Sequence, residues 1–144
     1  MSKCYKLAAK MTGCHKIAPG ATHIVEVEVT PEMTAEAFGN PGVPALASPR
    51  LLALLEEAAI KAISPSLRAG EGSVGTRFHF SHLAPTPVGM RVRARATLVA
   101  VEGRRLTFRL EAEDERERIA EGEHERVVVE LTRFLDRVAT KRRS

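Results

Sequence analysis

Residues 48–63 read SPRLLALLEEAAIKAI, and this stretch decides the fold because it is the one long helix expected among strand-like runs. Ser48 is a favoured N-cap, and Pro49 stands at the first helical position, where proline is best tolerated. Pro65 disfavours helical backbone at the residue before it, so we expect the helix to end near Ile63. At roughly 1.5 Å per residue, this helix is a rod of about 22 Å.

Strand-like runs flank this helix, one before it and four after it. Each run alternates apolar and polar residues at the period of a half-buried strand, as in HIVEVEVT at residues 23–30. The later runs are Val74–Leu83, Met90–Val101, Arg104–Ala112 and Arg118–Leu131. Hairpin turns are expected at Glu102-Gly103 and Asp114-Glu115. The sequence therefore predicts an α+β fold, in which an antiparallel five-stranded sheet wraps around one central helix.

The size and composition fit a single domain. A chain of 144 residues that is 44% hydrophobic can bury a core without disulfides or metals. No stretch approaches the roughly 20 apolar residues that would span a bilayer. The N-terminus contains lysines but lacks the apolar run of a secretory signal, so we expect a cytoplasmic protein with no membrane partner.

The net charge of +4 is concentrated at the two ends of the chain. Residues 1–22 carry four lysines and no acid, and residues 133–144 have a surplus of four positive charges, which leaves residues 23–132 at −4. We therefore expect a poorly ordered basic tail over 1–22, a domain over 23–134 and a basic tail over 135–144. Binding of nucleic acid through the tails is the alternative, but the domain itself offers no basic face, so no nucleic-acid partner is predicted.

The two cysteines, Cys4 and Cys14, both fall in the N-terminal tail. Their spacing does not match a zinc site, and no set of nearby ligands completes one. We expect no metal and interpret both cysteines as reduced residues without a catalytic role.

Two adjacent glutamates of the helix belong to different faces at 100° per residue. The stripe expected to face water contains Arg50, Leu54, Glu57 and Lys61. The apolar stripe contains Glu56 with Leu52, Ala59, Ile60 and Ile63. A carboxylate on the apolar side costs free energy unless it is paired or takes part in chemistry, and burial would raise its pKa toward that of a general base. The alternative is a slightly rotated helix that leaves Glu56 at the boundary.

Two further polar residues are expected near Glu56. His82 has the strand parity of Phe78 and Phe80, so it points to the buried face at the end of its strand. It is either a hydrogen-bonded core histidine or a catalytic residue that faces the helix. Ser48 is explained by capping alone, although a hydroxyl at the positive end of a helix could also orient water or a substrate.

Two later motifs give weaker signals. The glycine-rich stretch 70–76 lacks the ending of a phosphate-binding P-loop, and we expect Gly75 to allow the close approach of a ligand or of another backbone. The run GEHER at 122–126 is interpreted either as a structural ladder of ion pairs or as the source of an arginine, Arg126, for a phosphate or a carbonyl.

These motifs together resemble the fluoroacetyl-CoA thioesterase-like family of hotdog-fold acyl-CoA thioesterases. The resemblance runs from about Val25 to Phe134 and is dense in GSVGT at 72–76, in HLAPTPVG at 82–89, in VEGRRL at 101–106 and in GEHER at 122–126. It implies a catalytic glutamate at Glu56 and a catalytic histidine at His82. Ser48 stands where the family has a catalytic threonine, and Gly75 and Arg126 match positions that contact the thioester substrate.

The resemblance implies hydrolysis of a short acyl thioester to a free acid and coenzyme A, in a homodimer that joins its sheets edge to edge. Glu56 would activate water or attack the carbonyl, His82 would move a proton or polarise the intermediate, and Ser48 would orient one of them. No cofactor is expected, because coenzyme A is part of the substrate. The loop at residues 40–44 lacks an aromatic side chain, so selectivity for a fluorinated acyl group is not expected. A non-catalytic acyl-CoA-binding module and a hotdog hydroxyacyl-thioester dehydratase are the alternatives.

Overall fold

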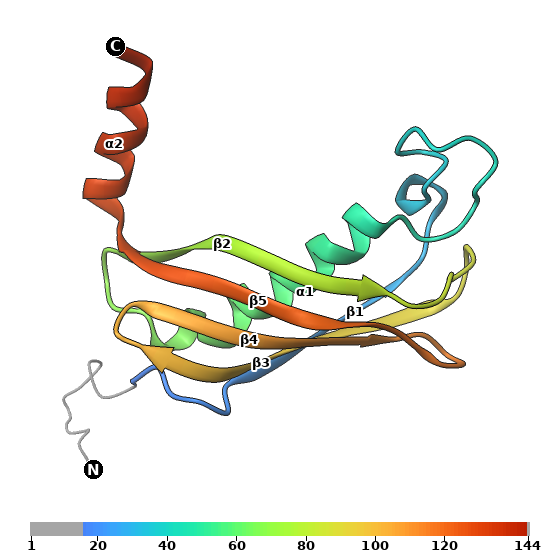
Figure 1. Ribbon diagram of the computed structural model, residues 1–144, viewed down its shortest axis with the longest axis horizontal. Coiled ribbons are helices and arrows are strands. Elements are labelled where there is room, and N and C mark those ends of the chain that lie inside the picture. Colours follow the sequence, from blue (N-terminus) through green and yellow to red (C-terminus); the bar gives the residue numbers. More distant parts are fainter. Residues whose placement is uncertain (1–15, 144) are drawn as a thin grey trace.

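The alternating runs form five antiparallel strands in the order β1-β3-β4-β5-β2, as Figure 1 shows. The computed structural model describes residues 16–143. Its strands are β1 (Thr22–Glu28), β2 (Glu71–His82), β3 (Arg91–Glu102), β4 (Arg105–Glu113) and β5 (Arg118–Glu130). Its helices are α1 (Ser48–Ile63) and α2 (Leu131–Arg143), with short 3-10 turns at Pro31–Met33 and Ser64–Ser66. The predicted α+β fold is confirmed, and α1 ends at Ile63 as predicted.

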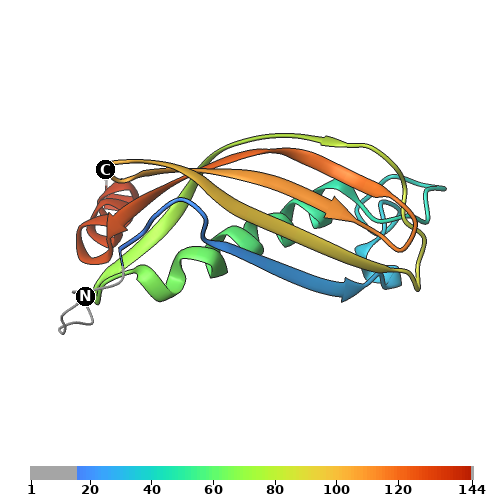
Figure 2. The same ribbon diagram turned by 90° about the horizontal axis from the view of Figure 1, so that it is seen from below.

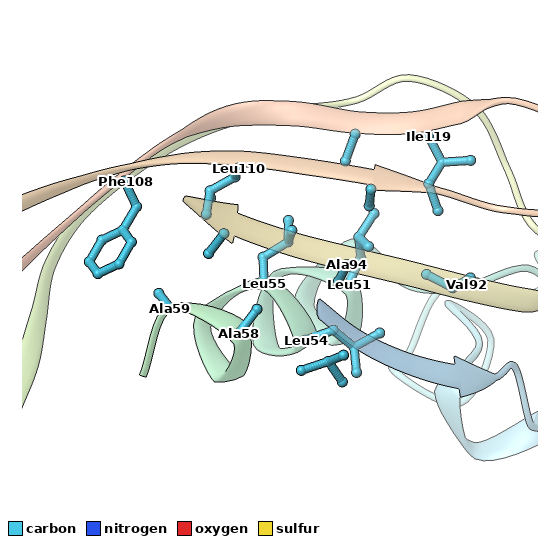
Figure 3. Packing of buried hydrophobic residues seen from close by; sticks show 14 of the residues in the cluster. Leu51, Leu54, Leu55, Ala58, Ala59, Val92, Ala94, Phe108, Leu110 and Ile119 are labelled. Atoms are coloured by element: carbon cyan, nitrogen blue, oxygen red, sulfur yellow. The ribbon is translucent and has the colours of Figure 1, made fainter. Parts of the chain in front are cut away.

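Helix α1 lies along one face of the curved sheet and packs mainly on β1 and β3 (Figure 2). Leucines and alanines of α1 meet the inward side chains of β3 and β4 in a core with few aromatic rings (Figure 3). The buried residues of α1 are Leu51, Leu54, Leu55, Ala58, Ala59 and Ile63. The arginines of β3 at positions 91, 93 and 95 are exposed on the opposite face, as the alternation predicts.

The buried face of α1 differs from the prediction by a rotation of the helix. Leu54, expected on the water-facing stripe, is buried, whereas Ile60 is 39% exposed. Leu51, Leu54, Leu55 and Ala58 follow the i, i+3, i+4, i+7 spacing and form a more continuous apolar stripe than the one predicted. This rotation leaves Glu56 at the boundary of the core, with 36% of its side chain exposed.

The sheet has two free edges, β1 and β2, and the β2 side of its inner face is only partly covered. Because α1 packs mainly on β1 and β3, the inward residues Phe78 and Phe80 of β2 are half-buried rather than enclosed. The pairing of β2 with β5 shifts register between Gly75 and Arg77, so β2 bulges at this point. Strand β2 therefore combines an open edge with an incompletely covered apolar face.

Residues 131–143 are helical, a structure that the sequence analysis did not predict. Helix α2 follows β5 directly and stands away from the sheet in Figure 1, with no buried residue of its own. Apolar residues at Leu131, Leu135 and Val138 are spaced as on one side of a helix, a pattern that charge counting alone does not detect.

The predicted N-terminal tail over 1–22 lies mostly outside the described residues, which begin at Lys16, and so do Cys4 and Cys14. Neither helix in the described range has the length and apolar character needed to cross a bilayer.

Candidate active site

Ser48 and His82 form a hydrogen-bonded pair where α1 begins and β2 ends. The Ser48 hydroxyl oxygen lies 2.7 Å from His82 Nδ1. The helix cap is Ala47, so the prediction of Ser48 as the N-cap is wrong by one residue, and Ser48 is the first helical residue. Its hydroxyl is therefore available to the histidine. The two residues are 34 positions apart in the chain, and the geometry assigns the serine a partner that capping does not explain.

The other ring nitrogen of His82 is buried without a partner. Nε2 is the one side-chain nitrogen or oxygen in the described part of the chain that is buried and makes no hydrogen bond. Burial lowers the pKa of His82 below its usual value, so the ring is neutral near pH 7. A neutral imidazole has one N–H and one acceptor, and an unpaired buried nitrogen has a free-energy cost. His82 is thus oriented by Ser48 at one nitrogen and has hydrogen-bonding capacity left at the other.

Glu56 forms an ion pair with a buried arginine from β5. Arg126 Nη1 donates to Glu56 Oε2 at 2.8 Å, and Arg126 is only 3% exposed. The same guanidinium donates through Nε to the Ser73 hydroxyl and through Nη2 to the Ser73 carbonyl, at 3.0 and 2.9 Å. A buried guanidinium needs such partners, because desolvation of an unpaired charge is costly. Arg126 therefore holds the Glu56 carboxylate in place, and the two bonds to Ser73 hold Arg126.

Gly75 brings the backbone of β2 against this ion pair. A methyl group at Gly75 would lie 2.8 Å from Glu56 Oε2 and 3.3 Å from Arg126 Nη1. The sequence predicts a close approach at Gly75, but to a ligand or a backbone, whereas the approaching group is the Glu56 carboxylate. A glycine is needed here because any side chain would displace that carboxylate.

His124 is a member of this cluster that the sequence analysis did not single out. Its Nε2 lies 3.1 Å from Arg126 Nη1, its Nδ1 lies 2.9 Å from the Arg77 carbonyl, and the residue is 1% exposed. The alternation of inward and outward residues along β5 could have identified it. His124 is two residues from Arg126 and four from Val128, so all three share the inward face of β5. Two polar residues on a buried face indicate a polar network, since isolated polar groups are rarely buried.

The five predicted site residues thus fall into two groups. Ser48 and His82 form one, and Glu56, Gly75 and Arg126 form the other. Ser48 and Glu56 are eight residues apart on α1, which places them about 12 Å apart along the helix axis. No hydrogen bond among residues 16–143 joins the two groups.

The family of this chain follows from comparison with known proteins. The family model described as fluoroacetyl-CoA-specific thioesterase matches residues 29–132, which include both groups of site residues. The chain belongs to this family. A curated member, the fluoroacetyl-CoA thioesterase of Streptantibioticus cattleyicolor, is 43% identical over 91 residues, and the match spans 63% of this chain and 66% of the relative.

Solved structures agree with this family. A threonine-to-serine mutant of the fluoroacetyl-CoA thioesterase FlK in complex with acetyl-CoA has a TM-score of 0.81 and 35% identity, over 87% of this chain and 98% of that one. A thioesterase superfamily member from Thermus thermophilus has a TM-score of 0.79 and 35% identity, over 88% and 95% of the two chains.

Membership in the fluoroacetyl-CoA-specific thioesterase family confirms the resemblance, the hotdog fold and the activity class, acyl-CoA thioester hydrolysis. The individual roles of Ser48, Glu56, His82, Gly75 and Arg126 stay predictions. Within residues 16–143, no three His, Cys, Asp or Glu side chains are grouped as ligands of a metal ion.

Proposed function

We propose that this chain hydrolyses short acyl-CoA thioesters with Glu56 as the base or nucleophile. The observation that carries the proposal is the Glu56 carboxylate itself, which is partly exposed and held at 2.8 Å by the buried Arg126. A carboxylate fixed in this way can take a proton from water or attack a thioester carbonyl without first being ordered. Arg126 steadies the carboxylate in this proposal, and Gly75 leaves room for the thioester.

His82 and Ser48 complete the proposed site. Addition of water or of the carboxylate to the carbonyl gives a tetrahedral oxyanion, and its collapse breaks the C–S bond and releases the coenzyme A thiolate. Direct addition of water yields the free acid, whereas attack by Glu56 gives an acyl-enzyme anhydride that water then hydrolyses. His82 relays to the thiolate the proton that Glu56 takes from water, or donates a hydrogen bond from Nε2 to the oxyanion. Backbone N–H groups near Gly75 or at the start of α1 support the same negative charge.

The acyl group is proposed to be short and not selected for fluorine. The FlK mutant with serine in place of threonine is described in complex with acetyl-CoA, and Ser48 is the serine that this chain has where the family has threonine. Residues 40–44 contain no aromatic side chain to close over an acyl group.

A panel of acyl-CoA substrates with a free-thiol assay tests the function. We expect turnover of acetyl-, propionyl- and butyryl-CoA and little turnover of palmitoyl-CoA. Binding of all of these without thiol release would support a non-catalytic acyl-CoA-binding module. Loss of water from 3-hydroxyacyl-CoA without thiol release would support a dehydratase.

Replacement of Ser48 separates its proposed role from helix stability. The Ser48 hydroxyl bonds His82 and does not cap the helix. Ser48→Ala is therefore expected to lower kcat by roughly 10-fold or more, as is typical when a positioned catalytic group loses its partner. Ser48→Thr keeps the hydroxyl and is expected to retain activity. The measurements are steady-state kinetics and thermal melting of both variants. A Ser48→Ala protein with unchanged kcat would show that the contact with His82 has no catalytic importance.

We further propose a cytoplasmic homodimer that joins its sheets through the β2 edges. Three features support this arrangement: the free edge of β2, the half-buried inward Phe78 and Phe80 beside it, and the separation of about 12 Å between the two groups of site residues in one chain. A two-fold axis at β2 would bring Glu56 of one protomer toward His82 of its partner. Each complete site would then lie at the subunit boundary.

Mixing two inactive variants tests this dimer. Glu56→Gln and His82→Ala are each expected to be inactive, and refolding them together should restore about a quarter of wild-type activity, because half of the random dimers are mixed and each has one intact site. Light scattering at micromolar concentration should give the dimer mass. A fully active monomer, or a dimer without restored activity in the mixture, would contradict shared sites.

A further inference from the structure

Among residues 16–143, His124 is the buried ionisable side chain that has no role in the proposed mechanism. We propose that His124 is a positioning residue, a neutral acceptor that fixes Arg126 and, through Arg126, the Glu56 carboxylate. This inference rests on the proposed function of Glu56. His124 does not touch the reacting atoms; it contacts Arg126, and Arg126 contacts the Glu56 carboxylate.

The proton of His124 can be located from its partners. A guanidinium has only donors, so the 3.1 Å contact from Arg126 Nη1 requires a lone pair on His124 Nε2. The proton is then on Nδ1, which donates to the Arg77 carbonyl at 2.9 Å. Burial lowers the pKa of His124, and the charge of Arg126 acts in the same direction, while the Arg77 carbonyl and the carboxylates of Glu56 and Glu125 act against it. The ring is therefore neutral, with its acceptor facing Arg126.

The acceptor is held in place by the packing of the ring. His124 stacks on Phe78 of β2 with centroids 3.9 Å apart and an angle of 10°, and Phe108 of β4 lies 6.0 Å away on a neighbouring strand. The bulge between Gly75 and Arg77 lies beside the Arg77 carbonyl, which accepts the hydrogen bond from Nδ1. Because both the ring plane and one of its hydrogen bonds are fixed, Nε2 presents its lone pair to Arg126 in a single direction.

A neutral acceptor suits this position better than a charged one. Arg126 Nη1 has two N–H groups, and its short contacts are Glu56 Oε2 and His124 Nε2. A carboxylate in place of the imidazole would compete with Glu56 for the guanidinium and would repel the Glu56 carboxylate. The imidazole satisfies the second N–H and leaves the charge of Arg126 to Glu56. Loss of this acceptor would leave one N–H of Nη1 unpaired, so that the guanidinium can tilt about its two bonds to Ser73 and shift the Glu56 carboxylate.

Three substitutions test separately the acceptor, the donor and the stacking of the His124 ring. His124→Gln can place an amide oxygen near the position of Nε2 and so retain the acceptor for Arg126. His124→Asn retains a donor near Nδ1 for the Arg77 carbonyl, and His124→Phe retains only the stacking. We expect His124→Gln to keep kcat within about threefold of wild type, and the Asn and Phe variants to lose roughly 10- to 100-fold in kcat with little change in KM. His79→Asn, on the exposed face of β2, is the matched control and should leave activity unchanged.

Two further measurements distinguish this proposal from a structural role and from failure of the proposed function. Nitrogen-15 NMR of the imidazoles should show His124 as the neutral Nδ1–H form at pH 7, and the Nε–H signal of Arg126 should shift in His124→Phe but not in His124→Gln. Both results are independent of activity, so they decide the positioning even if no acyl-CoA is hydrolysed. A charged ring, an Nε2–H form, or kcat losses in the Gln and Phe variants that are equal and follow their melting temperatures would overturn the inference.

Discussion

Glu56→Gln is expected to lower kcat/KM for acyl-CoA hydrolysis by at least about 10²-fold, because it removes the group proposed to act as base or nucleophile. The amide keeps the size of the side chain and an oxygen that can accept from Arg126. The variant therefore separates the chemistry of the carboxylate from its packing. Steady-state thiol release measures the effect, and thermal melting shows that the variant is folded.

The neighbouring residue supplies the control for Glu56. Glu57 pairs with Lys61 at 2.8 Å on the exposed side of α1, where a surface ion pair contributes little to stability. Glu57→Gln should leave turnover within about twofold of wild type, as surface substitutions away from a site usually have small effects. Equal losses in the two variants would show that the carboxylate of Glu56 has no special role.

Gly75→Ala is expected to lower kcat by roughly 10²-fold while the protein still folds. The added methyl group would lie 2.8 Å from Glu56 Oε2. The end of the Glu56 side chain can move, so the fold tolerates the added methyl group. The Glu56 carboxylate is nevertheless displaced from its contact with Arg126. A displacement of about 1 Å in a catalytic group can cost on the order of 10²-fold in rate. Kinetics and melting curves of the same preparation measure both consequences.

Gly72→Ala on the same strand is a matched control for Gly75→Ala. Its methyl group would also lie 2.8 Å from a side-chain atom, Leu131 Cδ2, but Leu131 is 39% exposed and can change its rotamer. We expect Gly72→Ala to keep its activity. Similar kinetic losses in both variants would mean that bending of β2, rather than displacement of Glu56, causes the effect.

Most of the fold could be predicted from local patterns. The alternation in the five runs depends only on the two faces of a strand, and the end of α1 depends on Pro65, so neither requires knowledge of distant contacts. The rotation of α1 was missed although the helical spacing of Leu51, Leu54, Leu55 and Ala58 is consistent with it. The prediction grouped Leu54 with the charged residues of its stripe, whereas packing on β1 and β3 buries Leu54 and leaves Ile60 exposed. Helix α2 was missed because charge counting over residues 133–144 conceals the spacing of Leu135 and Val138.

The sequence by itself determined the order of the five strands and α1, because periodicity is a local property of the chain. The resemblance of its motifs gave the family and marked Ser48, Glu56, His82, Gly75 and Arg126 as candidates. Only the tertiary structure decided their partners. Arg126 is 70 residues from Glu56, and His82 is 34 residues from Ser48. The approach of these pairs depends on the register of β2 against β5 and on the rotation of α1, which are set by packing of the whole core. For the same reason the structure alone identified His124.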